Sequence, residues 1–268
     1  MQLNPSPTIS NVGGKAYQLY HLKEICNVPD FFVVSFDNPE EIFDKKNQQI
    51  IYNHCISQKF ELMAVRSSAN CEDSSESSFA GMFKSILGVR PDGLIEAIEE
   101  VLDSVIADRV KGYCQVNGID FSKIKMSVIV QKMVDSRVSG VCFTRMNDRN
   151  DNLIIEACLG LGELLVSGQV KPDTYILDRE TCLILEESIG YQKFRQKLSV
   201  NNNSLYEEIP FYKRNSRKLS DEEIKKIAKA SILIEKQLGF YSADVEWSFE
   251  MDNFYILQAR SYFLRSIC

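Results

Sequence analysis

Residues 244–260 alternate apolar and polar side chains on both sides of one short turn. Residues 244–247 and 255–260 each show a period of two, which is typical of a half-buried β-strand. The triplet 251–253 between them, Met-Asp-Asn, has the composition of a turn. The segment therefore predicts an antiparallel hairpin with one buried face and one polar face, and the fold must accommodate such a ribbon.

If residues 251–253 form the loop, Glu246 faces Gln258 and Asp244 faces Arg260. The opposite, apolar face then holds Val245, Trp247, Leu257 and Ala259. Carboxylate and amide oxygens suit a divalent cation, and a guanidinium group suits phosphate oxygens. The first hypothesis is therefore ATP chemistry, and the alternative is a surface face with cross-strand charge pairs.

The bulk composition indicates a globular protein of one large domain or two lobes, with 268 residues, 44% of them apolar and 25% charged. The net charge of −6 argues against nucleic-acid and membrane partners, although a local basic cleft is compatible with it. The N-terminus lacks the features of a signal peptide, and no apolar run is long enough to span a bilayer. Eight cysteines without a CxxC pair indicate a reduced, cytoplasmic protein with no zinc site.

The remaining pattern mixes helices and strands without a regular alternation. Helices are expected at residues 11–26, 38–60, 94–110 and 221–238, the last between a Ser220–Glu223 capping box and Gly239. Strands are expected at residues 31–34, 62–66, 84–89, 126–130, 138–144 and 152–158. Residues 190–218 are predicted to be a polar excursion with weak strands. This order favours an α+β fold with mixed or antiparallel sheets over a doubly wound sheet.

Three further segments carry candidate binding groups. Lys15 follows two glycines before a helix, where it can meet a phosphate; the alternative is a turn with a solvated lysine. Arg66 ends a strand before a polar loop, residues 67–78, and can grip phosphate bidentately; the alternative is an edge arginine. Gln131 and Met133 can line an adenine between two lobes; the alternative is a strand end with a core methionine.

Together and in this order, the motifs resemble the ATP-binding domain of the pyruvate phosphate dikinase, phosphoenolpyruvate synthase and rifamycin phosphotransferase family. The resemblance runs from about Asn11 to Arg260. The matching segments are 13–15, 28–29, 32–34, 65–69, 72–73, 78–81, 131, 133–134, 139–141, 143–145, 160–163, 166–168, 172–173, 244, 246–247 and 258–260. The departures are Ala16, Asp30-Phe31, Met146-Asn147 and Ser261, which spare the proposed ligand groups and indicate a divergent branch.

The resemblance implies an ATP-grasp-like fold with lobes 1–133 and 134–268 and with ATP in the cleft between them. It implies that Mg²⁺ accompanies ATP, bound by Glu246 and Gln258. The groups assigned to ATP itself are Lys15 and Arg66 on the phosphates, Gly81 in a glycine loop over them, Gln131 and Met133 near adenine, and Arg260 on the transferred phosphoryl group. Of these, Lys15, Arg66 and Arg260 are the expected catalytic residues.

The resemblance further implies AMP-forming transfer of ATP phosphate to a histidine on a separate domain, and then to a small-molecule acceptor. That acceptor is pyruvate, an antibiotic hydroxyl or an amide such as that of glutamine. The departures from the family motifs make pyruvate a weaker expectation than the family alone implies. Neither His21 nor His54 has a phosphohistidine context, and the chain ends eight residues after Arg260. We therefore expect the histidine in a longer protein or a partner. The alternatives are a kinase or ligase that acts directly and a nucleotide-binding module without turnover.

Overall fold

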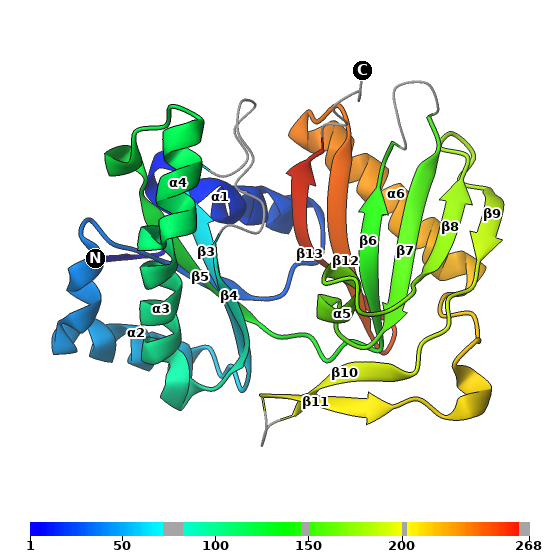
Figure 1. Cartoon of the computed structure of the whole chain (residues 1–268), viewed down its shortest axis with the longest axis horizontal. Helices are drawn as coiled ribbons and strands as arrows, with labels where there is room; N and C mark the ends of the chain where they lie inside the picture. Colours follow the sequence, from blue (N-terminus) through cyan, green and yellow to red (C-terminus); the bar gives the residue numbers. More distant parts are fainter. Residues whose placement is uncertain (72–82, 146–150, 200–202, 263–268) are drawn as a thin grey trace. The chain divides into compact units, whose positions relative to one another are not determined.

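The computed structural model describes residues 1–71, 83–145, 151–199 and 203–262 (Figure 1). The chain divides into two compact units, which we describe separately. The first unit comprises residues 1–20, 29–133 and 199–203, and the second comprises residues 21–28, 134–198 and 204–268. The longest segment of the first unit ends at Met133, and the second unit resumes at Val134.

The first unit is built on a five-stranded antiparallel sheet in the order β1-β2-β5-β3-β4. Its strands are β1 (Gln2–Leu3), β2 (Phe31–Ser35), β3 (Met63–Ala69), β4 (Ser85–Val89) and β5 (Met126–Lys132). The predicted strands are confirmed, but β3 is longer than expected. Ser67 and Ser68 pair with Val128 and Ser127 and are fully buried, so the polar loop expected from residue 67 begins later. Their hydroxyl groups make internal contacts, which the polar composition alone did not reveal.

Helices cover both faces of this sheet. Its helices are α1 (Ile9–Ile25), α2 (Lys45–Ser57), α3 (Leu94–Asp103) and α4 (Asp108–Val116), with 3-10 turns at Pro39–Phe43, Pro91–Gly93, Ser104–Ile106 and Phe121–Lys123. Val65 and Val130 belong to the core cluster that includes Ile51 of α2 and Ile98 of α3. On the opposite face the Ser127 hydroxyl donates to the Asn11 carbonyl of α1 at 3.0 Å.

Two of the predicted helices are interrupted. Residues 38–60 form a 3-10 turn and then α2, because Asp44 takes an extended backbone and caps the new helix through the Lys46 N–H at 2.8 Å. Residues 94–110 break after Asp103, where a 3-10 turn precedes α4. The apolar periodicity of residues 94–110 runs through the second break, and residues 38–60 are polar with scattered apolar positions, so neither pattern could locate a break.

The second unit is built on a six-stranded antiparallel sheet in the order β13-β12-β6-β7-β8-β9. Its strands are β6 (Val138–Phe143), β7 (Leu153–Leu159), β8 (Asp173–Leu177), β9 (Ile184–Ser188), β12 (Ala243–Glu250) and β13 (Asn253–Ser261). Helix α6 (Asp221–Leu238) packs across one face of it (Figure 1). The predicted capping box is confirmed: Ser220 Oγ accepts from the Glu223 N–H at 3.3 Å, and α6 ends at Gly239 with φ 68°.

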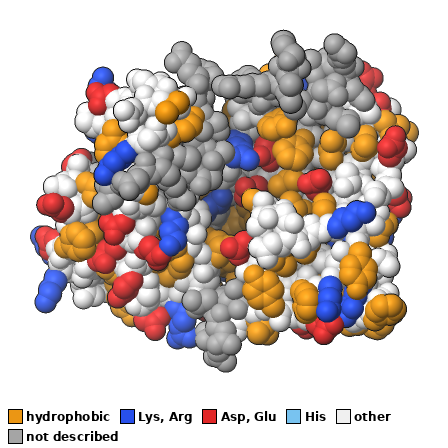
Figure 2. All heavy atoms as spheres, viewed as in Figure 1, with side chains coloured by type: hydrophobic (Ala, Val, Ile, Leu, Met, Phe, Trp, Pro, Cys, Tyr) orange, Lys and Arg blue, Asp and Glu red, His pale blue; other side chains and the backbone are white. Residues whose placement is uncertain are grey.

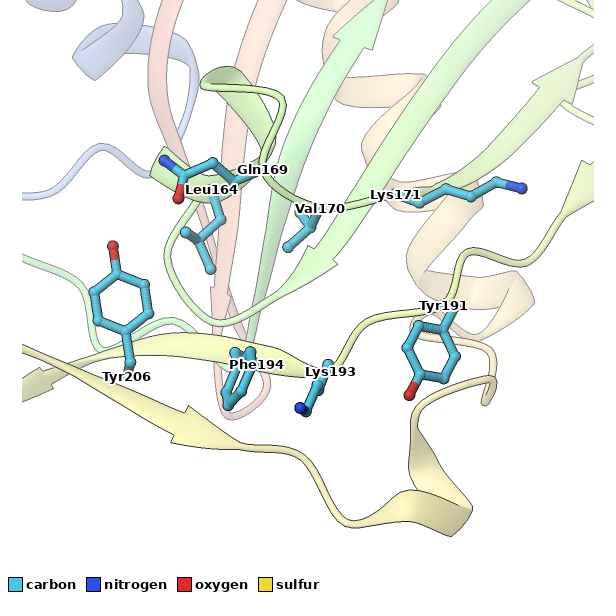
Figure 3. A pocket seen from close by; sticks show the side chains of 8 residues that line it. All are labelled: Leu164, Gln169, Val170, Lys171, Tyr191, Lys193, Phe194 and Tyr206. Carbon is cyan, nitrogen blue, oxygen red and sulfur yellow. The ribbon is translucent and has the colours of Figure 1, made fainter.

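The predicted excursion lies between β9 and α6. It forms a two-stranded ribbon of β10 (Phe194–Ser199) and β11 (Asn203–Glu208), followed by a 3-10 turn at Phe211–Lys213. Apolar and basic side chains lie side by side on this part of the surface (Figure 2). With the short helix α5 (Glu163–Val166) and the segment after it, the ribbon lines a pocket (Figure 3).

The expected α+β class with antiparallel sheets is confirmed in both units. Within the described ranges, no helix combines the length and the apolar character needed to cross a bilayer.

Candidate functional site

The first unit gathers Lys15, Arg66 and Gln131 into one polar cluster, which we call the helix–sheet cluster. Ala64 of β3 lies opposite Gln131 of β5, and Arg66, two residues further along β3, shares that face of the sheet. An Arg66 guanidinium N–H donates to Gln131 Oε1 at 3.1 Å. Lys15 Nζ donates to Ser67 Oγ at 3.2 Å. Residues that are far apart in the sequence are thus brought together by one helix and two neighbouring strands.

Gly13 sets the path of the chain into this cluster. Its φ of 77° and ψ of 170° interrupt α1, so the predicted glycine turn before a helix is confirmed. A Cβ atom at this position would lie 2.2 Å from the Ser68 carbonyl oxygen, a distance that only glycine avoids. The Ser68 hydroxyl accepts from the Ala16 N–H at 3.0 Å and satisfies a backbone donor at the new helix start. Ser68 was not singled out from the sequence.

The side-chain amide of Gln131 accepts a hydrogen bond at Oε1 but, among the described residues, donates none from Nε2. Its side chain is 3% exposed, and among the described residues its Nε2 group has no hydrogen-bond partner. A buried donor of this kind costs about 1–3 kcal/mol when it is left unsatisfied. The group therefore fits an acceptor atom of a ligand. Met133 is half-buried, and its N–H donates to the Leu62 carbonyl at 2.9 Å. Gly81 lies outside the described residues.

The second unit carries the hairpin cluster, which comprises Asp244, Glu246, Gln258 and Arg260. The predicted pairs are confirmed, with Glu246 opposite Gln258 and Asp244 opposite Arg260. Arg260 donates from Nε at 2.8 Å and from Nη2 at 2.6 Å to the same carboxylate oxygen, Asp244 Oδ2. Asp244 is 4% exposed and Gln258 is 6% exposed, whereas Glu246 is half-buried. The cluster therefore presents carboxylate and amide oxygens beside a cation that is held by a buried acid.

The turn of this hairpin differs from the prediction. Glu250 pairs with Asn253, so the loop has two residues, and Met251 in it has φ 50°. A β-bulge after Glu246 offsets the shorter loop and restores the predicted pairs at the polar end. Trp247 consequently pairs with Ile256, and the expected place of Leu257 on the buried face is wrong. Ile256 is 1% exposed, whereas Leu257 is half-buried.

Glu156 of β7 adds a carboxylate to the same face of the sheet. Glu246 pairs with Val141, and Val141 pairs with Glu156, so the two glutamates share a face two strands apart, roughly 10 Å. Burial raises the pKa of the Glu156 carboxyl. Glu156 was not among the predicted site residues, although a single glutamate within the otherwise apolar segment 153–159 was a usable signal.

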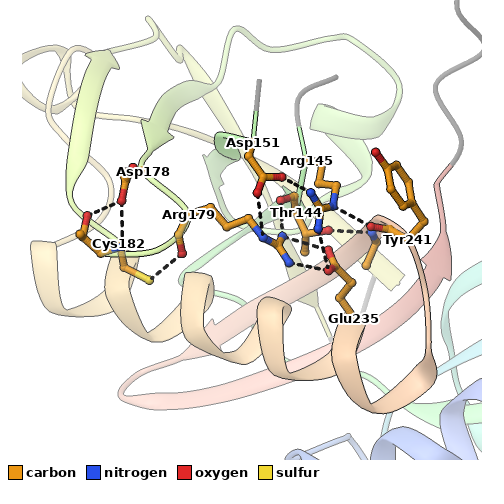
Figure 4. Close-up of polar contacts among 10 residues, drawn as sticks. Thr144, Arg145, Asp151, Asp178, Arg179, Cys182, Glu235 and Tyr241 are labelled. Atoms are coloured by element: carbon orange, nitrogen blue, oxygen red, sulfur yellow. Dashed lines mark hydrogen bonds and ion pairs between the residues drawn. The ribbon is translucent and has the colours of Figure 1, made fainter. Parts of the chain in front are cut away.

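A network of ion pairs fixes the entry into β12 (Figure 4). Arg179 forms a forked ion pair with the buried Glu235 of α6 and donates to the Thr144 carbonyl at 2.6 Å. Thr144 Oγ1 accepts from the Ala243 N–H at 2.7 Å, next to Asp244. Arg145 donates to the Tyr241 carbonyl at 2.8 Å. The Phe143-Thr144-Arg145 motif therefore supports the hairpin cluster through the backbone at the start of β12.

Comparisons with known proteins place the chain in a family. Residues 47–264 match the family described as "Pyruvate phosphate dikinase, AMP/ATP-binding domain". A probable phosphoenolpyruvate synthase of Methanocaldococcus jannaschii is 37% identical over 201 residues, which are 74% of this chain and 17% of that protein. The corresponding protein of Pyrococcus abyssi is 35% identical over 255 residues, which are 89% of this chain and 30% of that protein. The chain thus spans less than a third of the length of these relatives.

Solved structures show weaker likeness. An ATP complex of D-alanine–D-alanine ligase from Bacillus anthracis gives a TM-score of 0.43 at 13% identity, covering 94% of this chain and 54% of that one. An N5-carboxyaminoimidazole synthase from Aspergillus clavatus gives a TM-score of 0.43 at 11% identity, covering 96% of this chain and 46% of that one. The family assignment rests on the sequence matches, which include both strands of the hairpin cluster. The chain belongs to the family of the pyruvate phosphate dikinase AMP/ATP-binding domain.

Proposed function

We propose that the chain is the ATP-binding module of a dikinase-like phosphotransferase. The observation that carries the proposal is the hairpin cluster, because its pairing was expected from the sequence and places Glu246 beside Gln258 in the structure. The family match and the relatives named phosphoenolpyruvate synthase support the same reading. The two lobes of the proposed ATP-grasp-like fold are residues 1–133 and 134–268.

In this proposal the helix–sheet cluster holds the nucleotide. Lys15 and Arg66 bind its phosphates, because cations with fixed geometry compensate the charge of the phosphate chain. Arg66 is oriented by the Gln131 amide, whose remaining donor suits a nucleotide acceptor atom. Gly81 and Met133 complete the proposed nucleotide site, above the phosphates and near the adenine respectively.

Mg²⁺ fits the hairpin cluster by the chemistry of the donor set. Glu246 offers carboxylate oxygens and Gln258 an amide oxygen, and hard cations prefer oxygen ligands of these types. A bound Mg²⁺ would neutralise charge on the phosphates. Arg260, held in place by Asp244, would contact the phosphoryl group that is transferred.

We further propose that the phosphate passes to a histidine on a separate domain, with release of AMP, and then to a small-molecule acceptor. His54 supports this because it packs edge-on against Phe32, with ring centroids 4.8 Å apart, and burial lowers its pKa. Such a ring is a structural part of the first unit. The names of the relatives favour pyruvate as the acceptor, ahead of an antibiotic hydroxyl or an amide. The free cysteines of the described chain suit a cytoplasmic location.

Calorimetric titration with ATP and Mg²⁺, followed by chromatography of the nucleotides, tests the proposal. The chain alone should bind ATP and release no AMP, and AMP should appear when a histidine-bearing domain of a relative is added together with pyruvate. A folded chain that binds no ATP would contradict the module itself. AMP or ADP formed with an acceptor alone would instead establish a kinase that acts directly.

A further inference from the structure

The excursion between β9 and α6, residues 190–218, differs in charge from the rest of the chain. It contains seven lysines and arginines against two glutamates, in a chain with a net charge of −6. Neither polar cluster described above draws on it. A local excess of positive charge attracts anionic partners, so the excursion is a candidate interaction surface.

A buried ion pair anchors both ends of the excursion to the main sheet. Asp173 of β8 is fully buried and accepts from the Gly190 N–H at 2.9 Å and from the Lys218 N–H at 2.8 Å. Lys218 Nζ forms an ion pair with the same carboxylate and donates to the Gly190 carbonyl at 3.0 Å. Tyr175 adds a hydrogen bond from its hydroxyl to Asp173 at 2.9 Å. The two ends of the excursion, Gly190 and Lys218, are therefore held on the main sheet of the second unit.

This anchored segment exposes large aromatic side chains. Tyr206 is 58% exposed, Phe211 is 81% exposed and Tyr212 is 76% exposed. Tyr191 and Phe194 are also exposed. Aromatic side chains in this density are enriched in protein–protein interfaces, where they supply contact area at a small cost in conformational entropy.

A pocket of about 240 Å³ lies between the ribbon and the segment that follows α5. Leu164 and Val170 lie on one side of it, and Phe194 of β10 and Tyr206 of β11 lie on the other (Figure 3). This volume accommodates one large side chain rather than a whole nucleotide. The pocket is therefore suited to an aromatic or branched apolar anchor residue.

Lysines lie on one side of this pocket. Lys171 and Lys193 line it, and Lys213 lies on the adjacent 3-10 turn. In the part of the chain that the structure describes, none of these three forms an ion pair, whereas Arg195 and Arg214 pair with Glu207 and Glu208. Lys193 Nζ lies 4.9 Å from the centroid of the Phe194 ring. The rim of the pocket therefore attracts negative charge.

We propose that this surface binds an acidic segment of a partner polypeptide, which places one aromatic or branched apolar side chain in the pocket. The anchor would pack between Leu164, Phe194 and Tyr206, and flanking carboxylates would meet Lys171 and Lys193. The pocket admits one side chain between apolar walls, which favours a peptide partner over a nucleic acid. This proposal is independent of the nucleotide chemistry.

The test uses the full chain and a fluorescein-labelled pentapeptide with one tryptophan between two pairs of glutamates, followed by fluorescence anisotropy. Phe194→Ala and Tyr206→Ala should each weaken binding by at least about tenfold, because they remove walls of the anchor pocket. Lys193→Glu should weaken it and reduce its salt dependence. Phe43→Ala, at an exposed aromatic of the first unit, and Lys229→Glu, on α6, are matched controls and should bind as the unchanged chain does.

Peptides that carry lysine in place of glutamate, or alanine in place of tryptophan, should bind at least about tenfold more weakly. No binding of the acidic peptide, or equal binding of the lysine peptide, would overturn the proposal. Tighter binding of a single-stranded RNA would assign the surface to nucleic acid instead. Self-association in sedimentation experiments that Phe194→Ala abolishes would assign it to a second copy of the chain.

Discussion

Among the contacts of the described residues, the two polar clusters orient their cations with different kinds of partner. In the helix–sheet cluster, Lys15 donates to a serine hydroxyl and Arg66 to an amide oxygen, which are neutral groups. In the hairpin cluster, Arg260 donates twice to the carboxylate of Asp244, which is almost fully buried. A neutral partner orients a cation without cancelling its charge, whereas a buried carboxylate also depends on the cation for its own stability.

We therefore expect substitutions in one cluster to affect ligand binding and substitutions in the other to affect stability. Loss of a neutral partner in the helix–sheet cluster should mainly change how an anion is bound. Loss of Arg260 in the hairpin cluster should remove two charge-assisted hydrogen bonds from a buried carboxylate and lower the stability of the fold. The same kind of substitution is therefore expected to give opposite patterns in the two clusters, and the following predictions test that contrast.

Arg260→Leu should have the largest effect, lowering the free energy of unfolding by about 3 kcal/mol, because it removes the guanidinium that donates twice to the buried Asp244 carboxylate. Urea denaturation measures it. The double variant Asp244→Asn, Arg260→Leu should recover much of this loss, since it removes the charge as well. If adding Asp244→Asn to Arg260→Leu lowered the stability further instead of restoring it, the buried charge of Asp244 would not be the cause of the loss.

Glu246→Ala should leave the fold intact and weaken binding of Mg²⁺-ATP by at least about a hundredfold, because it removes the carboxylate proposed to bind the metal. Glu246 is half-buried and lies outside the Asp244–Arg260 pair, so the free energy of unfolding should change little. Calorimetry with ATP, in the presence and absence of Mg²⁺, measures the difference. Equal Mg²⁺ dependence in the variant and the unchanged chain would remove Glu246 from the metal site.

Gln131→Leu should weaken ATP binding by about tenfold and leave adenosine binding nearly unchanged, because Arg66 loses the acceptor that orients it. The free energy of unfolding should hardly fall, since the substitution also removes a buried donor without a partner among the described residues. Arg66→Ala is the companion variant and should likewise weaken ATP more than adenosine. An equal loss for both ligands in Gln131→Leu would instead make Gln131 a contact of the adenine.

The two clusters also differ in how far the sequence could predict them. In the hairpin cluster both strands are adjacent in the chain, so alternation and a short turn were enough to pair Glu246 with Gln258. The two-residue loop and the bulge escaped prediction because their effects on the register cancel. In the helix–sheet cluster the residues come from elements far apart in the chain. Their motifs identified the family, but the contacts of Arg66 with Gln131 and of Lys15 with Ser67 depend on strand order, which no local pattern contains.

A substitution of Glu156 should change the free energy of unfolding least. Glu156 is a carboxylate without a described cation partner, in contrast to Asp244. Burial raises its pKa, so the folded state binds the proton more tightly than the unfolded state does. Its contribution to stability is therefore present at pH values below the ordinary glutamate pKa, and it is lost as the pH rises through the raised pKa of the folded state. Glutamine does not ionise, so Glu156→Gln should abolish the fall in stability that accompanies deprotonation of this carboxyl.

The variant should accordingly match the unchanged chain near pH 4 and exceed it in stability near pH 7. The gain should stay below about 1 kcal/mol, because the side chain is only half-buried and solvent screens it. Urea denaturation across this pH range measures the difference, with Glu186→Gln on the exposed strand β9 as the control. A gain that is the same at both pH values would show that packing at β7, and not the proton, distinguishes Glu156 from the paired acid Asp244.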